Sequence, residues 1–241
     1  MLSILLFLAV GAVAFTNGAN ANFKGCASLY GSGTTTLRRA LLWGTATTFL
    51  GSLAAIWLSH GLLQKFSGRG IVPQDLLQRP QFATAVALGG AATSFLATRF
   101  AFPVSTTHAL LGALVGAGLA GHGELHLDAL LKSFVAPLLF SPGLALLLGA
   151  AVSGILRQVG LAPQQRSLLL DTLHLASTGG ASFARGLNDT PKMAALLLAS
   201  PEVNLTWGFV AVGVVIALGG LLDADRVAET LRSEEHTSEL Q

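Results

Sequence analysis

Residues 15–24 have the sequence FTNGANANFK, and residues 183–192 have the sequence FARGLNDTPK. Phe, Gly, Asn and Lys stand at identical spacing in the two stretches, without a gap. The same register pairs Gly51 with Gly219 further along the chain. Because many membrane transporters are built from two related halves, this match predicts an internal repeat.

The composition around these two stretches is that of a membrane protein. Of the 241 residues, 52% are hydrophobic and 11% are charged, whereas a soluble chain carries about 25% charged residues. The mean hydropathy is +0.65. A helix needs about 20 mostly apolar residues to cross a bilayer. Windows without Asp, Glu, Lys or Arg that meet this requirement are residues 1–23, 40–64, 133–156 and 203–222.

Other apolar windows are interrupted. Windows 80–98 and 100–123 are separated by a single arginine, and Pro103 interrupts the second one near its start, which predicts one span followed by a re-entrant or broken hairpin. Window 172–184 is too short to cross a bilayer and runs into the polar residues 185–192. We therefore expect an all-α, multi-pass membrane protein in which this last helix is discontinuous.

The register of the repeat also divides the chain. It places the counterpart of the polar stretch 103–108 beyond residue 241, so we expect one whole repeat, about residues 1–125, and an incomplete second repeat, about residues 168–231. Together they form one predicted transporter domain, residues 1–231. Residues 232–241 break the composition abruptly, and a reverse translation of them resembles a sequencing-library adapter. We expect a non-native tail there, the alternative being a solvated acidic tail.

The first polar stretch places the hydroxyl side chains of Ser105, Thr106 and Thr107 directly after Pro103, where a new helix is expected to begin. A helix N-terminus offers unpaired N–H groups and the positive end of the helix dipole, so an oxyanion fits there. The alternative is that Ser105 or Thr106 only caps the helix. Three consecutive hydroxyl groups inside a membrane segment favour an anion site.

The second polar stretch contains Asn188 and Asp189. A carboxylate among apolar spans is costly, so we expect Asp189 to bind a coupling cation, Na⁺ or H⁺, and not only to cap a helix. Asn20 and Asn22 supply amides at the matching place in the first repeat. Ala21 stands where the second repeat has Asp189, so one carboxylate is missing.

These residues carry a family resemblance. The sequence Gly18-Ala-Asn-Ala-Asn22 resembles the Gly-Ala-Asn-Asp signature of the inorganic phosphate transporter (PiT) family, residues 186–189 resemble its second copy, and residues 103–108 resemble the hairpin motif that follows the first. The resemblance covers about residues 1–231. It implies an inverted-repeat, all-helical carrier that imports phosphate with Na⁺ or H⁺ and holds its substrate between the repeats.

The residues that the resemblance and the polar stretches assign to the substrate are Asn20, Asn22, Ser105, Thr106, Thr107, Asn188 and Asp189, of which Asn20, Asn188 and Asp189 are also expected at the coupling cation. Importing a doubly charged anion against 100 mV costs about 4.6 kcal/mol, at about 2.3 kcal/mol per charge, so at least two cations would be needed. Two departures from the family stand out: Ala21 replaces a signature aspartate, and the second hairpin motif is absent. We therefore expect the chain as given to be an inactive fragment.

Alternative functions stay open. A permease for sulfate or another oxyanion would need the same hydroxyl groups, and a channel with paired half-helices could share the pattern. An intramembrane hydrolase using Ser105 and His108 lacks an oriented third member, so we expect no enzyme. The expected partners are inorganic phosphate and the lipid bilayer, with a homodimer considered and nucleic acid not expected. No cofactor and no metal beyond Na⁺ is expected, and the predicted location is the plasma or inner membrane.

Overall fold

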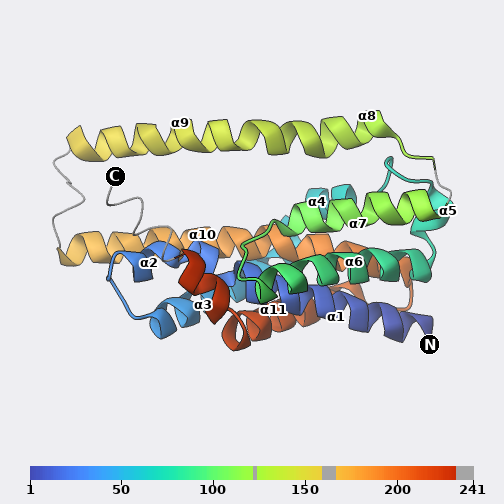
Figure 1. The fold of residues 1–241 in the computed structure, drawn as a ribbon, viewed down its shortest axis with the longest axis horizontal. Helices are drawn as coiled ribbons and strands as arrows, with labels where there is room; N and C mark the ends of the chain where they lie inside the picture. The colour runs from blue at the N-terminus through green and yellow to red at the C-terminus, as the bar shows by residue number, and fades with distance from the viewer. Residues whose placement is uncertain (122–123, 159–166, 232–241) are drawn as a thin grey trace.

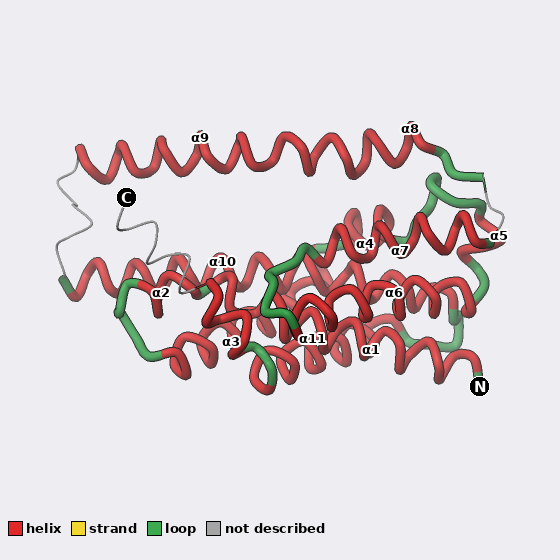
Figure 2. The backbone as a smooth tube through the Cα atoms, in the orientation of Figure 1, coloured by secondary structure: helices red, strands yellow, loops and turns green. Residues whose placement is uncertain are grey.

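The computed structural model describes residues 1–121, 124–158 and 167–231. The expected non-native tail, residues 232–241, lies outside the described residues. Within the described ranges every named element is a helix, as the backbone trace in Figure 2 shows. This confirms the predicted all-helical class.

The long apolar windows form the expected membrane-spanning helices. Among the described residues, the segments long and apolar enough to cross a membrane are Leu2–Gly25, Leu37–Leu58, Leu127–Gln158 and Leu205–Leu222. They coincide with the four charge-free windows of the sequence, so the chain is a multi-pass membrane protein.

The elements follow one another along the chain with short connections. The N-terminal part contains α1 (Leu2–Ala21), the 3₁₀ turn η1 (Asn22–Gly25), α2 (Ala27–Gly31), α3 (Leu37–Leu58), α4 (His60–Phe66), α5 (Gln74–Leu77), α6 (Pro80–Arg99) and α7 (Thr106–Ala120). The rest contains α8 (Leu127–Leu130), the π-helical turn η2 (Leu131–Val135), α9 (Ala136–Gln158), α10 (Leu168–Ala194), the 3₁₀ turn η3 (Ala195–Ala199) and α11 (Leu205–Leu222).

The helices form a bundle that α9 does not join. Helix α10 packs mainly against α3, while α1 packs against both α6 and α11. Helix α9 runs alongside the bundle in Figure 1, and none of its residues is buried. Its apolar side chains are therefore available to lipid.

The main hydrophobic core lies where α1 meets α6 and α7. Its fully buried side chains include Leu6, Val10 and Val13 of α1, Val86 of α6 and Leu110 of α7. Burying a side chain of this size contributes about 1.5–3 kcal/mol relative to leaving it exposed to water. This core fixes the hairpin of α6 and α7 against the end of α1.

Windows 80–98 and 100–123 form two packed helices, α6 and α7, joined by residues 100–105, and a re-entrant course in the membrane stays a prediction. Pro80 starts α6, where its missing N–H costs nothing, and the Ser105 side chain caps α7 by accepting a hydrogen bond from the His108 backbone N–H at 3.4 Å. Ala101 in the connection has a φ of 59°, which is rare for a residue other than glycine. The connection is therefore a tight turn with a defined shape.

The prediction of a discontinuous helix at residues 185–192 is wrong. Helix α10 continues without interruption from Leu168 to Ala194, with Pro191 inside its last turn. Pro191 removes a single backbone hydrogen bond there. The charged residues Arg185, Asp189 and Lys192 form ion pairs along the same face of the helix, so these charges are compensated inside an intact helix. In the first repeat the helix does end, at Ala21, and the 3₁₀ turn follows it.

Gly186 lies where α10 crosses α3. A Cβ at Gly186 would collide with the backbone oxygen of Thr48 in α3, and a Cβ at Gly51 of α3 would collide with the backbone oxygen of Phe183 in α10. The two helices thus cross backbone to backbone, as small residues permit in membranes. The glycine is needed for this close approach.

The crossing of α1 and α11 has the same form. A Cβ at Gly18 would collide with the backbone oxygen of Ile216, and a Cβ at Gly219 with that of Phe15. Gly18 and Gly219 are the residues that the repeat register pairs with Gly186 and Gly51, so each repeat supplies one helix to each crossing. This reciprocal packing supports the predicted internal repeat.

Candidate functional site

The polar residues of α10 form a buried cluster of charges. Arg185, Asp189 and Lys192 lie three and four residues apart, which places them on one face of the helix. The Oδ1 atom of Asp189 lies 2.9 Å from Nζ of Lys192, and its Oδ2 atom lies 3.6 Å from Nε of Arg185. The side chain of Lys192 is only 4% exposed. Buried charges of this kind persist when they are paired, as here.

Asn17 of α1 connects this cluster to the hairpin. Its Nδ2 atom donates to Oδ2 of Asp189 at 3.2 Å and to Oγ1 of Thr106 at 2.5 Å. Its Oδ1 atom accepts a hydrogen bond from a terminal guanidinium N–H of Arg185 at 2.9 Å. Asn17 is completely buried, so one amide ties α1, α7 and α10 together.

The hairpin presents its hydroxyl groups to the same cluster. Nζ of Lys192 donates to Oγ1 of Thr107 at 2.8 Å. Thr106 and Thr107 occupy the first turn of α7, where backbone N–H groups have no acceptor within the helix. The first turn of α7 therefore lies beside the ammonium group of Lys192, with the Thr107 hydroxyl oxygen as its acceptor.

A second lysine approaches from the first repeat. Lys24 lies in the 3₁₀ turn η1, and its Nζ atom donates to the backbone oxygen of Val104 at 2.5 Å. The side chain of Asn20 holds the connection between α6 and α7 in place. It accepts a hydrogen bond from the Val104 N–H at 2.8 Å and donates one to the Phe102 oxygen at 2.8 Å. Lys24 is exposed, whereas Asn20 is buried.

These elements enclose a cavity of about 400 Å³, which is large enough for a small anion. Its lining combines the 3₁₀ turn η1, the hairpin tip and α10 (Ala21, Lys24, Gly25, Val104, Ser105, Thr106, Thr107, Ala181, Arg185, Asn188, Asp189 and Lys192). The lining carries three cationic side chains and one carboxylate, a net formal charge of +2. We call it the cationic cavity.

The structure brings most of the predicted site residues together. Ser105, Thr106, Thr107, Asn188 and Asp189 all line the cationic cavity. Ala21 lines it as well, so the position of the missing carboxylate does face this space.

The other two predicted residues lie beside the cavity and do not line it. Asn20 holds the hairpin turn. Asn22 is completely buried, donates to Oγ1 of Thr45 at 2.6 Å and accepts from Arg185 at 3.2 Å. Their amides position the residues around them, and their predicted contact with substrate stays a prediction.

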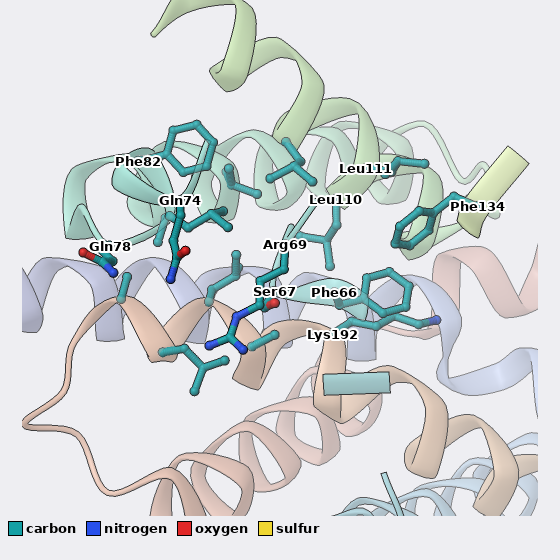
Figure 3. Close-up of a pocket in the computed structure, with 18 residues that line it drawn as sticks. Phe66, Ser67, Arg69, Gln74, Gln78, Phe82, Leu110, Leu111, Phe134 and Lys192 are labelled. Atoms are coloured by element: carbon teal, nitrogen blue, oxygen red, sulfur yellow. The ribbon is translucent and has the colours of Figure 1, made fainter. Parts of the chain in front are cut away.

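A second cavity, of about 100 Å³, lies on the other side of Lys192. Figure 3 shows its mostly apolar lining, with Lys192 beside Phe66 and with Arg69 and Gln74 further along. Nζ of Lys192 lies 5.3 Å from the centre of the Phe66 ring, a cation–π distance. Lys192 therefore separates the cationic cavity from an apolar one.

Sequence reasoning gave too little weight to Arg185, Asn17 and Lys192. The spacing of Arg185 and Lys192 around Asp189 was a usable signal, because it is the spacing of ion pairs on a continuous helix. It was overlooked because a break was expected there. Asn17 carried a weaker signal, since it occupies the place of Arg185 in the repeat register.

Comparison with known proteins agrees with this geometry. Residues 17–168 match the model of the phosphate transporter family, PHO4. The chain belongs to the phosphate transporter family. It is a transporter and not an enzyme, as predicted.

Individual relatives support this membership. A protein of Streptomyces halstedii named "Probable low-affinity inorganic phosphate transporter" is 30% identical over 73% of this chain and 84% of its own length. A sulfate permease of Bacillus subtilis (strain 168) is 27% identical over 75% of this chain and 51% of its own length. A solved structure titled "The sodium-dependent phosphate transporter" matches with a TM-score of 0.69 at 19% identity, over 96% of this chain and 78% of that one.

Proposed function

We propose that this transporter binds inorganic phosphate in the cationic cavity and carries it across the plasma or inner membrane. The observation that carries the proposal is the convergence of Lys24, Arg185 and Lys192 with the first turn of α7 on one cavity. Phosphate oxygens are bound in proteins by such cations, by hydroxyl groups and by helix N-termini. The family and its phosphate-transporting relatives support the same substrate.

We further propose that uptake is coupled to a cation, and that this cation is H⁺ because Asp189 is poorly placed to bind Na⁺. Hard cations such as Na⁺ take oxygen ligands with free lone pairs. The oxygens of Asp189 already contact the donors of Lys192, Asn17 and Arg185. A sodium ion there would stand next to two positive charges, and Ala21 offers no second carboxylate. Sodium is nevertheless named for the solved structure of similar fold, so the ions are to be separated by experiment.

Sulfate is a second candidate because a sulfate permease is among the relatives. Sulfate has the shape of phosphate but no proton to donate at neutral pH. The carboxylate of Asp189 lines the cavity and can accept a hydrogen bond from the hydroxyl group of phosphate. A site that uses such a bond rejects an analogue without the donor. Asp189 therefore favours phosphate.

The test is binding of radiolabelled phosphate to the purified chain in detergent, with sulfate as competitor. Arg185→Gln removes a charge-assisted contact worth about 1.5–3 kcal/mol, so phosphate affinity should fall at least about tenfold. Arg38→Gln, at an exposed position outside the cavity, is the matched control and should bind like the unmodified chain. Arg185→Lys, which keeps the charge, should retain most of the binding. Equal binding by the Arg185→Gln and Arg38→Gln chains would refute the proposed site.

Coupling is tested in proteoliposomes that contain the same chain. Phosphate uptake is measured with an imposed pH gradient, with an imposed sodium gradient, and with neither. Any uptake by this chain would contradict the sequence prediction of an inactive fragment; where uptake occurs, we expect it to follow the pH gradient. Uptake that follows only the sodium gradient would contradict H⁺ coupling while leaving phosphate as the substrate.

A further inference from the structure

We propose that the cationic cavity selects the divalent form of its oxyanion and binds it without sodium, because Lys24, Arg185 and Lys192 supply the whole counter-charge. This inference rests on the proposed function, since it specifies the charge state of the anion that the same cavity takes. It concerns binding and is separate from the ion gradient that drives uptake.

The charge balance gives the first argument. The three cations and Asp189 leave a net formal charge of +2, which a divalent anion neutralises. A monovalent anion would leave one positive charge uncompensated beside the buried side chains of Arg185 and Lys192, which is unfavourable. A sodium ion bound together with a divalent anion would again leave one positive charge uncompensated in the cavity. The cavity is thus electrically complete with a dianion alone.

Arg185 gives the second, independent argument. Within the described part of the chain, Nε of Arg185 is buried and has no hydrogen-bond acceptor. The terminal nitrogens of the same guanidinium group donate to Asn22, Thr48 and Asn17, so the group is held in place and cannot turn to find another acceptor. Buried donors without acceptors are rare and costly. An oxygen of an anion in the adjacent cavity would supply the missing acceptor.

The ionised state of Asp189 follows from its contacts. Its Oδ1 atom accepts from Lys192 at 2.9 Å, and its Oδ2 atom accepts from Asn17 at 3.2 Å. Two cationic side chains and an amide donor thus surround the carboxyl group, which stabilises its ionised form. The carboxylate counts as one negative charge, and the lysine ammonium beside it as one positive charge.

Other titratable groups near the cavity do not change this sum. The hairpin contributes Ser105, Thr106 and Thr107, which are neutral. His108 lies one residue further along and lines a neighbouring cavity with Ser105. Cys26, between η1 and α2, is buried against Gly44 of α3. The net charge of the cationic cavity is thus set by η1 and α10.

The experiment compares phosphate with sulfate across neutral pH. Phosphate gains its second negative charge in this range, as phosphate groups with a second pKa of about 6 do, whereas sulfate stays divalent throughout. Binding of each labelled anion to the purified chain is measured on both sides of the transition. Each series is run in sodium chloride and in N-methylglucamine chloride of equal ionic strength.

We expect phosphate affinity to rise with pH in proportion to its divalent fraction, while sulfate affinity stays constant. Replacing sodium should change either affinity by less than about twofold, far below the tenfold that 1.4 kcal/mol represents. Constant sulfate affinity also shows that the lysines keep their charge over the range. Phosphate binding that requires sodium, or that follows the monovalent form, would overturn this inference and leave the proposed function intact. Binding of neither anion under any condition would overturn the proposed function itself.

A charge variant tests the assignment of the counter-charge. Lys24→Gln lowers the net charge to +1, so affinity for sulfate should fall at least about tenfold and the pH dependence of phosphate binding should flatten. Lys24→Arg should restore both. Lys65→Gln, at an exposed lysine outside the cavity, is the matched control. A Lys24→Gln chain that folds normally and keeps the unmodified pH profile would show that Lys24 contributes no counter-charge.

Discussion

Replacing Gly186 with alanine should force α3 and α10 apart. A Cβ at this position would collide with the backbone oxygen of Thr48 and lie 3.0 Å from the backbone nitrogen of Ser52. Both are main-chain atoms of a helix, so neither can rotate out of the way as the end of a side chain could. The helices must therefore separate or bend.

The size of the effect follows from a comparison within the same helix. Overpacking a close contact costs about 1–3 kcal/mol. Gly180 also lies in α10, but a Cβ there would meet nothing within 4 Å. Gly180→Ala should therefore stabilise the helix by about 0.5–1 kcal/mol, the usual advantage of alanine over glycine. The same advantage applies to Gly186→Ala, so the two variants should differ by the cost of overpacking alone, about 1–3 kcal/mol.

The assay is thermal unfolding of both variants in the same detergent, followed by circular dichroism. In a chain of about 150–250 residues, 1 kcal/mol shifts Tm by about 2–4 °C, so Gly186→Ala should melt at least about 2 °C below Gly180→Ala. Gly219→Ala, which introduces the same collision at the crossing of α1 and α11, should behave like Gly186→Ala. A Gly186→Ala chain as stable as Gly180→Ala would refute the backbone-to-backbone crossing.

Three further changes probe the site. Lys192→Gln leaves Asp189 with Arg185 at 3.6 Å as its ion-pair partner, so in denaturant titrations the free energy of unfolding should fall by less than the roughly 3–5 kcal/mol that an unpaired buried charge costs. Adding Asp189→Asn leaves Arg185 unpaired and should lower it further; restored stability would contradict the pairing. Asn20→Ala releases the hairpin turn at Val104 and should lower phosphate affinity in the binding assay without changing the preference over sulfate, whereas a changed preference would indicate direct contact with substrate. Ala21→Asp adds a carboxylate to the cavity and should make phosphate binding depend on sodium; binding that stays independent of sodium would show that a carboxylate here is insufficient.

The helical class and the four apolar spans were predictable because both depend on composition and length. The pair of helices α6 and α7 was predictable from Arg99, which separates two apolar windows, and from Pro103, which interrupts the second window and precedes three hydroxyl residues. Ser105 caps α7, which was the alternative to an anion site in the sequence analysis, and it also lines the cationic cavity. A capping role and a binding role are thus compatible in one residue.

The course of α10 was not predictable from the same rules. Glycine, asparagine and proline within seven residues are typical of a break, and sequence alone does not show which glycine faces another backbone. Gly186 lies against Thr48, a contact between segments far apart in the chain. Likewise the hydrogen bond between Asn17 and Thr106 joins α1 to α7 and becomes visible only when the helices are packed. Long-range packing decided both features.

The two repeats differ in charge in a way that bears on the missing carboxylate. In the repeat register Asn17 corresponds to Arg185 and Ala21 to Asp189, so the second repeat has an i, i+4 ion pair where the first has neither member. The absence of an aspartate at position 21 therefore accompanies the absence of an arginine at position 17. Each of the two matched stretches has a lysine at its last position, Lys24 in the first and Lys192 in the second. Losing the whole pair leaves the positive charge of the cavity unchanged, whereas losing the carboxylate alone would have added an unpaired cation. In the first of the two matched stretches, residues 15–24, Lys24 is thus the one charged residue, and the cavity keeps the net charge of +2 on which the proposed binding of a divalent oxyanion rests.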